Sequence, residues 1–318
     1  MKKIKLIVYL LCVLFFCLQT SLANELDKQL LGSIVKGDRS KTEALLTQGA
    51  NPNVSGKFDY FPLIYAAEDD NVKIAKLLIK YGATPDKKTP TGYTPLIAAA
   101  EQGSMQMVRL LLEHGAKPQT KTRKGHDAFM VAVQSGFEDV LSMLIGYGAS
   151  VNTADKKGKT ALMLAIEKNH FHIMRILLMA GADTNVENSS SGTALMLAAE
   201  KKDISYVKEL LLRNASITAQ DDTGSTALHI AASFGNYQTL KLLLASNKND
   251  MLINMADNDG WTALMMAAFE GHKKVVKLLL EQHSDISLKN TSNQTALILA
   301  EKSKHDQTAV LLKQFKKH

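Results

Sequence analysis

The chain has 318 residues, of which 46% are hydrophobic, 22% are charged and only 6% are aromatic. This composition is that of an ordinary globular protein, and it excludes a low-complexity chain or a highly charged disordered one. The formal net charge of +7 is modest for this length and does not by itself indicate a nucleic-acid partner.

The first residues have the pattern of a secretory signal peptide. Three lysines within the first five residues precede an apolar run over 6–18, and Ser-Leu-Ala follows at 21–23. We therefore expect residues 1–23 to be a signal peptide that is cleaved before Asn24. The alternative is an uncleaved anchor, but the run is short for a membrane span of about 20 residues. No later segment is long and apolar enough to cross a membrane.

The cysteine count indicates the compartment. Cys12 and Cys17 both lie inside the predicted signal peptide, so the mature chain would contain no disulfide, thiolate nucleophile or cysteine metal site. Removing three lysines and no acidic residue lowers the net charge from +7 to +4. We expect an exported protein, in a bacterial periplasm, with secretion into the medium as the alternative.

From residue 24 to residue 318 the sequence repeats with a period of 33 residues. A large apolar residue marks the start of each predicted repeat, and every interval is 33 residues except one of 36. The marker residues are Leu30, Leu63, Leu96, Phe129, Leu162, Leu195, Leu228, Leu264 and Leu297. A pair of adjacent aliphatic residues, such as Leu177-Leu178, recurs with the same period. A period of this length predicts a solenoid of about nine helix-turn-helix repeats in one domain, 24–318.

One repeat shows how the residues specify two helices. Thr160 can cap the first helix through its hydroxyl group, and six other repeats carry Thr or Asp in that position. Asn169 or a glycine turns the chain, and Gly181 ends the second helix in a left-handed conformation. The last repeat carries Glu301 where earlier repeats have a buried residue, and its end is rich in lysine, as expected of a terminal repeat.

These motifs resemble a known family. Thr94-Pro95-Leu96-Ile97-Ala98-Ala99, Thr226-Ala227-Leu228-His229-Ile230-Ala231-Ala232 and Gly181-Ala182-Asp183-Thr184-Asn185 are similar to the signature sequences of ankyrin repeats. The resemblance covers about residues 25–315. It implies an all-α ankyrin-repeat solenoid with β-hairpin loops, called fingertips, between the repeats. It also implies a protein partner that docks on the fingertips and on the concave ends of the first helices.

Motifs for catalysis are weak. Gly158-Lys159-Thr160 resembles the end of a phosphate-binding loop, but Thr153 occupies the position of that motif's first glycine. His170 and His172 are two residues apart and do not share a helix face. We expect no catalytic residue, no cofactor and no metal, and we predict that the chain is not an enzyme.

Two clusters are candidates for binding the partner. The basic cluster consists of five residues in the fingertips of repeats 4 and 5: Arg123, Lys124, Lys156, Lys157 and Lys159. The alternative is that these residues form an ordinary solvated face.

The aromatic cluster consists of Phe234, Trp261 and Phe269, in positions that are polar in other repeats. Exposed apolar patches mark interaction sites. The alternative is that these rings pack internally against the three-residue insertion around residues 248–250.

The sequence thus predicts a monomeric periplasmic scaffold with a protein partner, no nucleic-acid partner and no membrane span after cleavage. A secreted factor that binds host proteins is the second hypothesis. A hydrolytic or redox enzyme is the third, and the lack of cofactor motifs and thiols in the mature chain argues against it.

Overall fold

The computed structural model describes residues 24–246 and 252–315. The predicted signal peptide, the insertion around residues 248–250, and Lys316 and Lys317 lie outside the described residues. The chain divides into two compact units, one ending at Ser150 and the other beginning at Val151. We call them the N-terminal and the C-terminal unit, and their boundary falls between the predicted repeats 4 and 5.

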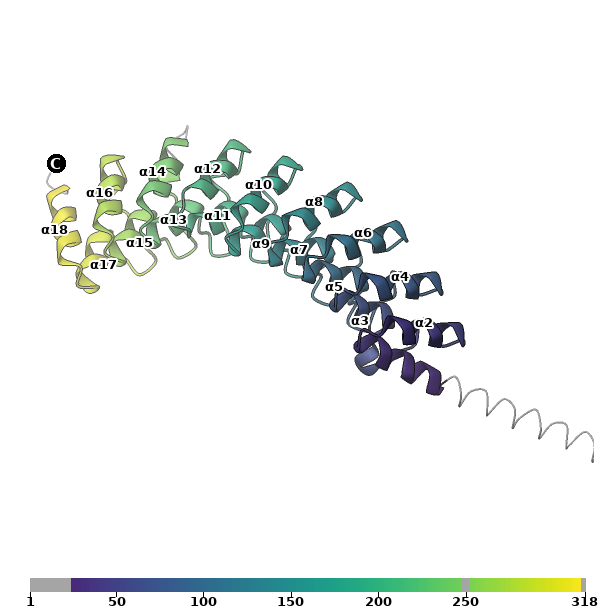
Figure 1. Ribbon diagram of the computed structural model, residues 1–318. Helices are drawn as coiled ribbons and strands as arrows, with labels where there is room; N and C mark the ends of the chain where they lie inside the picture. Colours follow the sequence, from purple (N-terminus) through teal and green to yellow (C-terminus); the bar gives the residue numbers. More distant parts are fainter. Residues whose placement is uncertain (1–23, 247–251, 316–318) are drawn as a thin grey trace, which may run out of the picture. The chain divides into compact units, whose positions relative to one another are not determined.

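The N-terminal unit consists of one helix pair for each of its repeats. A helix over residues 24–35 begins the described chain. The other elements are α2 (Arg39–Thr47), η1 (Lys57–Asp59), α3 (Pro62–Glu68), α4 (Val72–Lys80), α5 (Pro95–Gln102), α6 (Met105–Glu113), α7 (Ala128–Ser135) and α8 (Glu138–Gly146). The first helices α3, α5 and α7 pack in one row, and the second helices α2, α4, α6 and α8 pack in another (Figure 1).

The C-terminal unit repeats the same arrangement. Its elements are α9 (Ala161–Glu167), α10 (Phe171–Met179), α11 (Ala194–Ala199), α12 (Ser205–Leu212), α13 (Ala227–Ser233), α14 (Tyr237–Ser246), η2 (Leu252–Asn254), α15 (Ala263–Phe269), α16 (Lys273–Glu281), α17 (Ala296–Lys302) and α18 (Asp306–Phe315). The first helices α9, α11, α13, α15 and α17 pack in sequence. The second helices from α12 to α18 form the other row (Figure 1). The predicted all-helical repeat fold is therefore confirmed.

The predicted caps begin the first helices. The hydroxyl oxygen of Thr160 accepts a hydrogen bond from the backbone N–H of Met163 at 3.2 Å. Equivalent bonds form at Thr94, Asp127, Thr193, Thr262 and Thr295. Phe61 has no such side-chain bond, and Pro62 in the next position favours the helix by its fixed φ. These caps fix where each first helix starts, and with it where each fingertip ends.

Small residues allow the first helices to pack closely. Ala66, Ala67, Ala231 and Ala232 are fully buried between neighbouring first helices. Glycine ends the second helices as predicted, with φ of 81° at Gly148 and 88° at Gly181, and Asn214 takes the same role at 58°. In the last repeat, Glu301 is exposed and forms an ion pair with Lys313 at 2.7 Å. The predicted polar outer face of the terminal repeat is thus present.

The fingertips are tight turns and not extended strands. In the fingertip before α15, the N–H of Asp257 donates to the carbonyl of Trp261 at 2.9 Å. Neighbouring fingertips are joined by further bonds, such as the one from the N–H of Asn258 to the carbonyl of Thr223 at 2.9 Å. The described residues contain no strand, only two isolated antiparallel bridges, Ala154–Thr160 and Ala256–Thr262. Each fingertip is long enough for one hydrogen-bonded turn, so no ladder develops.

Candidate functional site

An aromatic pair joins a fingertip to a first helix in the C-terminal unit. Trp261 ends the fingertip before α15, and Phe269 is the last residue of that helix. Their ring centroids are 5.4 Å apart and their planes make an angle of 86°, which is a favourable edge-to-face geometry. Phe269 is still 43% exposed, so the contact with Trp261 does not bury it. The predicted meeting of these two side chains is therefore observed, with an apolar surface left open to water.

The equivalent two positions hold polar pairs in other repeats. The hydroxyl of Tyr93 donates to the carboxylate of Glu101 in the N-terminal unit. Lys159 forms an ion pair with Glu167 in the C-terminal unit. Both pairs are eight residues apart, as Trp261 and Phe269 are. One geometric position between fingertip and helix thus carries a hydrogen bond, an ion pair or an aromatic contact, depending on the repeat.

The aromatic pair lines a recess that also contains three carboxylates. The recess has a volume of about 390 Å³. Its lining consists of Ser233, Asp257, Asp259, Trp261, Met266, Phe269 and Glu270, and we call it the acidic recess. Within residues 24–246 and 252–315, no lysine or arginine lines it or forms an ion pair with its three acids. The result is a locally negative, partly aromatic surface on a chain with a positive net charge.

Asp257 holds the fingertip in place. Its carboxylate Oδ1 accepts the backbone N–H groups of Asp259 at 3.0 Å and of Trp261 at 2.8 Å. The same two bonds recur at Asp155 and Asp221. The recurring Asp is therefore a structural feature of the fingertips. In this repeat it also places a charge beside the aromatic pair.

A buried histidine supports the fingertip from below. His229 of α13 has no exposed surface. Its Nδ1 accepts the backbone N–H of Thr226 at 3.1 Å, and its Nε2–H lies 3.0 Å from the carbonyl of Met255 and 3.1 Å from that of Trp261. Burial lowers the pKa of His229, partly opposed by the negative charge of Asp257. The neutral imidazole thus links the first helix of one repeat to the fingertip of the next.

Phe234 lies apart from the aromatic pair. It is 57% exposed and lines a different recess, of about 530 Å³, with Lys202, Tyr237 and Lys274 among its neighbours. Among the described residues, it has no ring contact with Trp261 or Phe269. Of the three predicted aromatic residues, the structure brings two together.

The predicted basic cluster is divided between the two units. Arg123 and Lys124 are exposed in the N-terminal unit, and Lys156 and Lys157 are exposed in the C-terminal unit. Lys159 is half-buried and its charge is compensated by the ion pair with Glu167. Four side chains of the cluster therefore present their charge to solvent.

Sequence reasoning missed a tyrosine cluster in the N-terminal unit. Tyr60 stacks on Tyr93 with a centroid distance of 5.9 Å and contacts Tyr65 at 5.5 Å. Burial raises the pKa of Tyr93 and that of Glu68. The three tyrosines come from two fingertips and a helix, so no local spacing connected them. The hydroxyl groups of two of them bind carboxylates, which makes this cluster a largely satisfied part of the fold.

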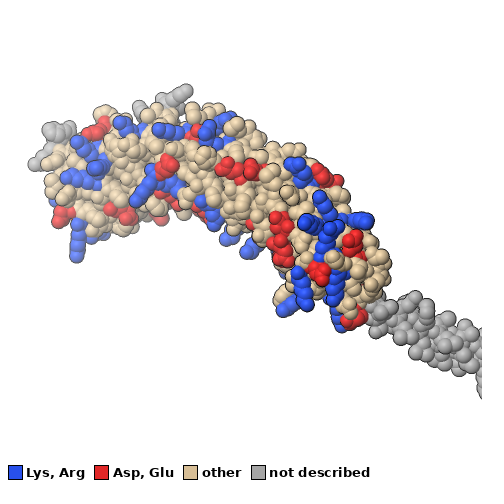
Figure 2. All heavy atoms as spheres, viewed as in Figure 1, with Lys and Arg blue, Asp and Glu red and all other residues tan. Residues whose placement is uncertain are grey.

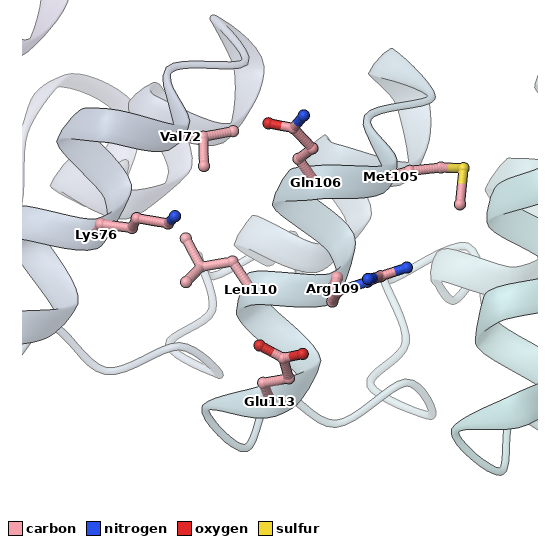
Figure 3. A pocket seen from close by; sticks show the side chains of 7 residues that line it. All are labelled: Val72, Lys76, Met105, Gln106, Arg109, Leu110 and Glu113. Carbon is pink, nitrogen blue, oxygen red and sulfur yellow. The ribbon is translucent and has the colours of Figure 1, made fainter.

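A groove between second helices has a different character. It has a volume of about 520 Å³ and lies between α4, which contributes Val72 and Lys76, and α6. Figure 3 shows Lys76 and Leu110 directed toward the space between the two helices. Charges of both signs line it, and Figure 2 shows lysine, arginine and acidic residues mixed over much of the visible surface. This groove therefore offers no distinct ligand chemistry.

Candidates for catalysis remain weak in three dimensions. Within residues 24–246 and 252–315, no three His, Cys, Asp or Glu side chains are placed so that they could hold a metal ion. The Nε2 of His272 lies 2.8 Å from the carbonyl of Ser233, so this turn histidine links neighbouring repeats. A separate point concerns membranes. None of the helices in the described ranges is long and apolar enough to span a bilayer.

Comparison with known proteins agrees with this geometry. The family model described as ankyrin repeats (3 copies) matches residues 31–122, 118–188, 180–251, 195–290 and 249–317. No curated protein matches the chain. Repeats of this kind indicate a protein–protein interaction scaffold, and proteins built from them are typically non-enzymatic.

Proposed function

Because the chain belongs to the ankyrin-repeat family, we propose that it is a scaffold whose C-terminal unit binds one protein partner through Trp261 and Phe269. The observation that carries this proposal is an aromatic pair, partly open to water, in positions that hold polar pairs in other repeats. Exposed apolar patches on soluble proteins mark interaction sites. Tryptophan is also enriched among the residues that dominate the free energy of binding at interfaces.

The exposed lysines and arginine have a secondary role in this proposal. Arg123, Lys124, Lys156 and Lys157 are exposed on fingertips, where their charges would steer an acidic surface of the partner. Rim charges mainly change the association rate and its salt dependence. Replacing Lys156 and Lys157 with alanine should therefore slow association with little effect on dissociation.

The test uses the partner captured from the native host with the mature chain, then purified. Trp261→Ala and Phe269→Ala should each weaken binding by about 2 kcal/mol, or roughly 30-fold in Kd. Leu212→Ala is the matched control, because Leu212 is 75% exposed, ends the second helix α12 of the same unit and does not line the recess of the aromatic pair. A large loss of folding stability with unchanged binding would instead indicate internal packing of the aromatic pair.

The compartment is part of the proposal. The basic start, the apolar run and the Ser-Leu-Ala sequence at 21–23 support export to the periplasm. Fractionation of the producing cells and their medium, followed by immunoblotting, distinguishes periplasmic from secreted protein. Recovery in the cytoplasm would contradict both. We also propose that the scaffold is a monomer, which light scattering on the purified mature chain would test.

A further inference from the structure

From the acidic recess, we infer that the partner inserts a cationic side chain, arginine or lysine, against Trp261 and Phe269 and between the surrounding carboxylates. This inference rests on the proposed function and adds the chemistry of the bound group. The sequence predicted the aromatic residues as a purely apolar patch. The structure places Asp257, Asp259 and Glu270 around them.

The first step of the argument is electrostatic. Three acidic side chains line one recess of about 390 Å³, and no basic side chain of the described residues lines it. The described part of the chain supplies no ion pair to these carboxylates, so their negative charge is open to a complementary charge from a partner. The contrast with Lys159 and Glu167 is direct, since there the chain provides both charges itself.

The second step concerns the aromatic rings. The face of an aromatic ring attracts a cation, and tryptophan does so most strongly. With their planes at 86°, the edge of one ring meets the face of the other, so the contact leaves part of the ring surface uncovered. Phe269 keeps 43% of its surface exposed as a result. A guanidinium or ammonium group can thus contact a ring and a carboxylate together, as neither an acidic nor a purely aliphatic side chain can.

The third step concerns rigidity. Asp257 binds two backbone N–H groups of the fingertip, and His229 binds its carbonyls from the buried side. The backbone that carries the ring of Trp261 and the carboxylate of Asp259 is therefore fixed by hydrogen bonds. A site that is ordered before binding loses less conformational entropy when the ligand arrives. A metal ion is not the expected occupant, since the described residues contain no metal-binding arrangement of acids and histidines.

The experiment uses Trp261 as its own reporter, because it is the chain's only tryptophan. The probe is the peptide acetyl-Gly-Ser-Arg-Ser-Gly-amide, added to the mature full-length chain. Its neutral counterpart contains citrulline in place of arginine, and a lysine peptide is paired with its acetyl-lysine form. Indole fluorescence and the NMR signal of the indole N–H should shift saturably with the arginine and lysine peptides. Binding of the citrulline and acetyl-lysine peptides should be at least about tenfold weaker, since charge-assisted contacts and cation–π attraction both disappear.

The variants separate this inference from the proposed function. Asp259→Asn with Glu270→Gln should weaken peptide and partner binding at least about tenfold, because the charge-assisted contacts are lost. Both residues enter the fingertip and helix bonding only through their backbone groups, so the fold should be unchanged. The matched control is Glu281→Gln, which removes one exposed charge at the end of α16.

Three results would overturn the inference. Equal binding of the charged and neutral peptides would do so, as would undiminished partner binding by the double variant. Binding of choline without binding of either cationic peptide would assign the recess to a small molecule. If the double variant bound the partner normally while Trp261→Ala abolished binding, the proposed function would stand, and only the inferred cationic group would be wrong. If Trp261→Ala and Phe269→Ala also had no effect, the proposed binding surface itself would be wrong.

Discussion

Replacing His229 with alanine should destabilise the C-terminal unit by about 3 kcal/mol. The imidazole is fully buried and joins α13 to the fingertip before α15. In the variant, the carbonyl of Trp261 keeps its bond from the N–H of Asp257 at 2.9 Å. The N–H and the hydroxyl group of Thr226 and the carbonyl of Met255 lose their hydrogen bonds to the imidazole. Each unpaired group costs about 1–3 kcal/mol, and water reaching the half-buried Met255 lowers its share.

The measurement has to be local, because repeat proteins unfold in parts and a single global free energy is poorly defined for them. Native-state hydrogen exchange of the amides of α13 and α15 reports the opening free energy where the bonds are lost. His272→Ala is the control, since its imidazole makes one hydrogen bond within the described residues, to the carbonyl of Ser233 at 2.8 Å. It should cost about 1 kcal/mol, as expected for a single hydrogen bond.

The reasoning would be refuted if His229→Ala and His272→Ala destabilised the chain equally. It would also be refuted if protection fell only in α13 and remained unchanged in α15. Either outcome would mean that the buried imidazole does not couple the two repeats. The variant should further weaken binding of the arginine peptide, because it releases the backbone below Trp261.

Four more predictions follow, three from the structure and one from the sequence. Burial lowers the folded-state pKa of His229. The contribution of His229 to the free energy of unfolding is therefore fully present above about pH 6.5, the unfolded pKa, and is lost as the pH falls through the lower folded pKa. The stability difference between wild type and His229→Ala should shrink in acid. Gly181→Val should cost about 1–2 kcal/mol in chemical denaturation through left-handed strain alone, because the added Cβ meets nothing within 4 Å. Gly271→Ala should cost more, because its Cβ would lie 2.5 Å from Nδ1 of His305. Intact mass of the chain from its native host should correspond to a start at Asn24, and full-length membrane-bound material would contradict the predicted cleavage.

The repeat frame could be predicted from the sequence because its signals are local. A threonine cap acts on the residue three positions later, and a glycine at a helix end acts on its own turn, as Thr160 and Gly181 do. Periodicity then assigns the same roles to all repeats. Two fingertip features were not predictable in this way. The length of a turn decides whether strands form. The bonds of Asp257 reach residues two and four positions later and are local, but an Asp in a loop has the same sequence pattern when its carboxylate is solvated.

The candidate site was only partly predictable, for a geometric reason. Phe234 is six residues after Leu228, and Phe269 is five residues after Leu264. One residue along an α-helix rotates the side chain by about 100°, so the two phenylalanines point in different directions. Treating adjacent positions as equivalent therefore placed Phe234 in a patch that it does not enter. The ion pair of Lys159 was missed because it joins residues eight apart across a fingertip and a helix, which is not a helical spacing.

The two positions at each junction between fingertip and first helix link the fold to its function. Where they hold Tyr93 with Glu101, or Lys159 with Glu167, each side chain satisfies its partner's polar group, and the chain has little left to offer a ligand there. An aromatic pair holds the same junction by packing, and it needs no polar partner for its rings. Neighbouring positions bring carboxylates to this junction, such as that of Asp259, and these form no ion pair within the described chain. An aromatic pair thus preserves the repeat, and the carboxylates of Asp257, Asp259 and Glu270 beside it supply the negative charge on which the inferred recognition of a cationic group rests.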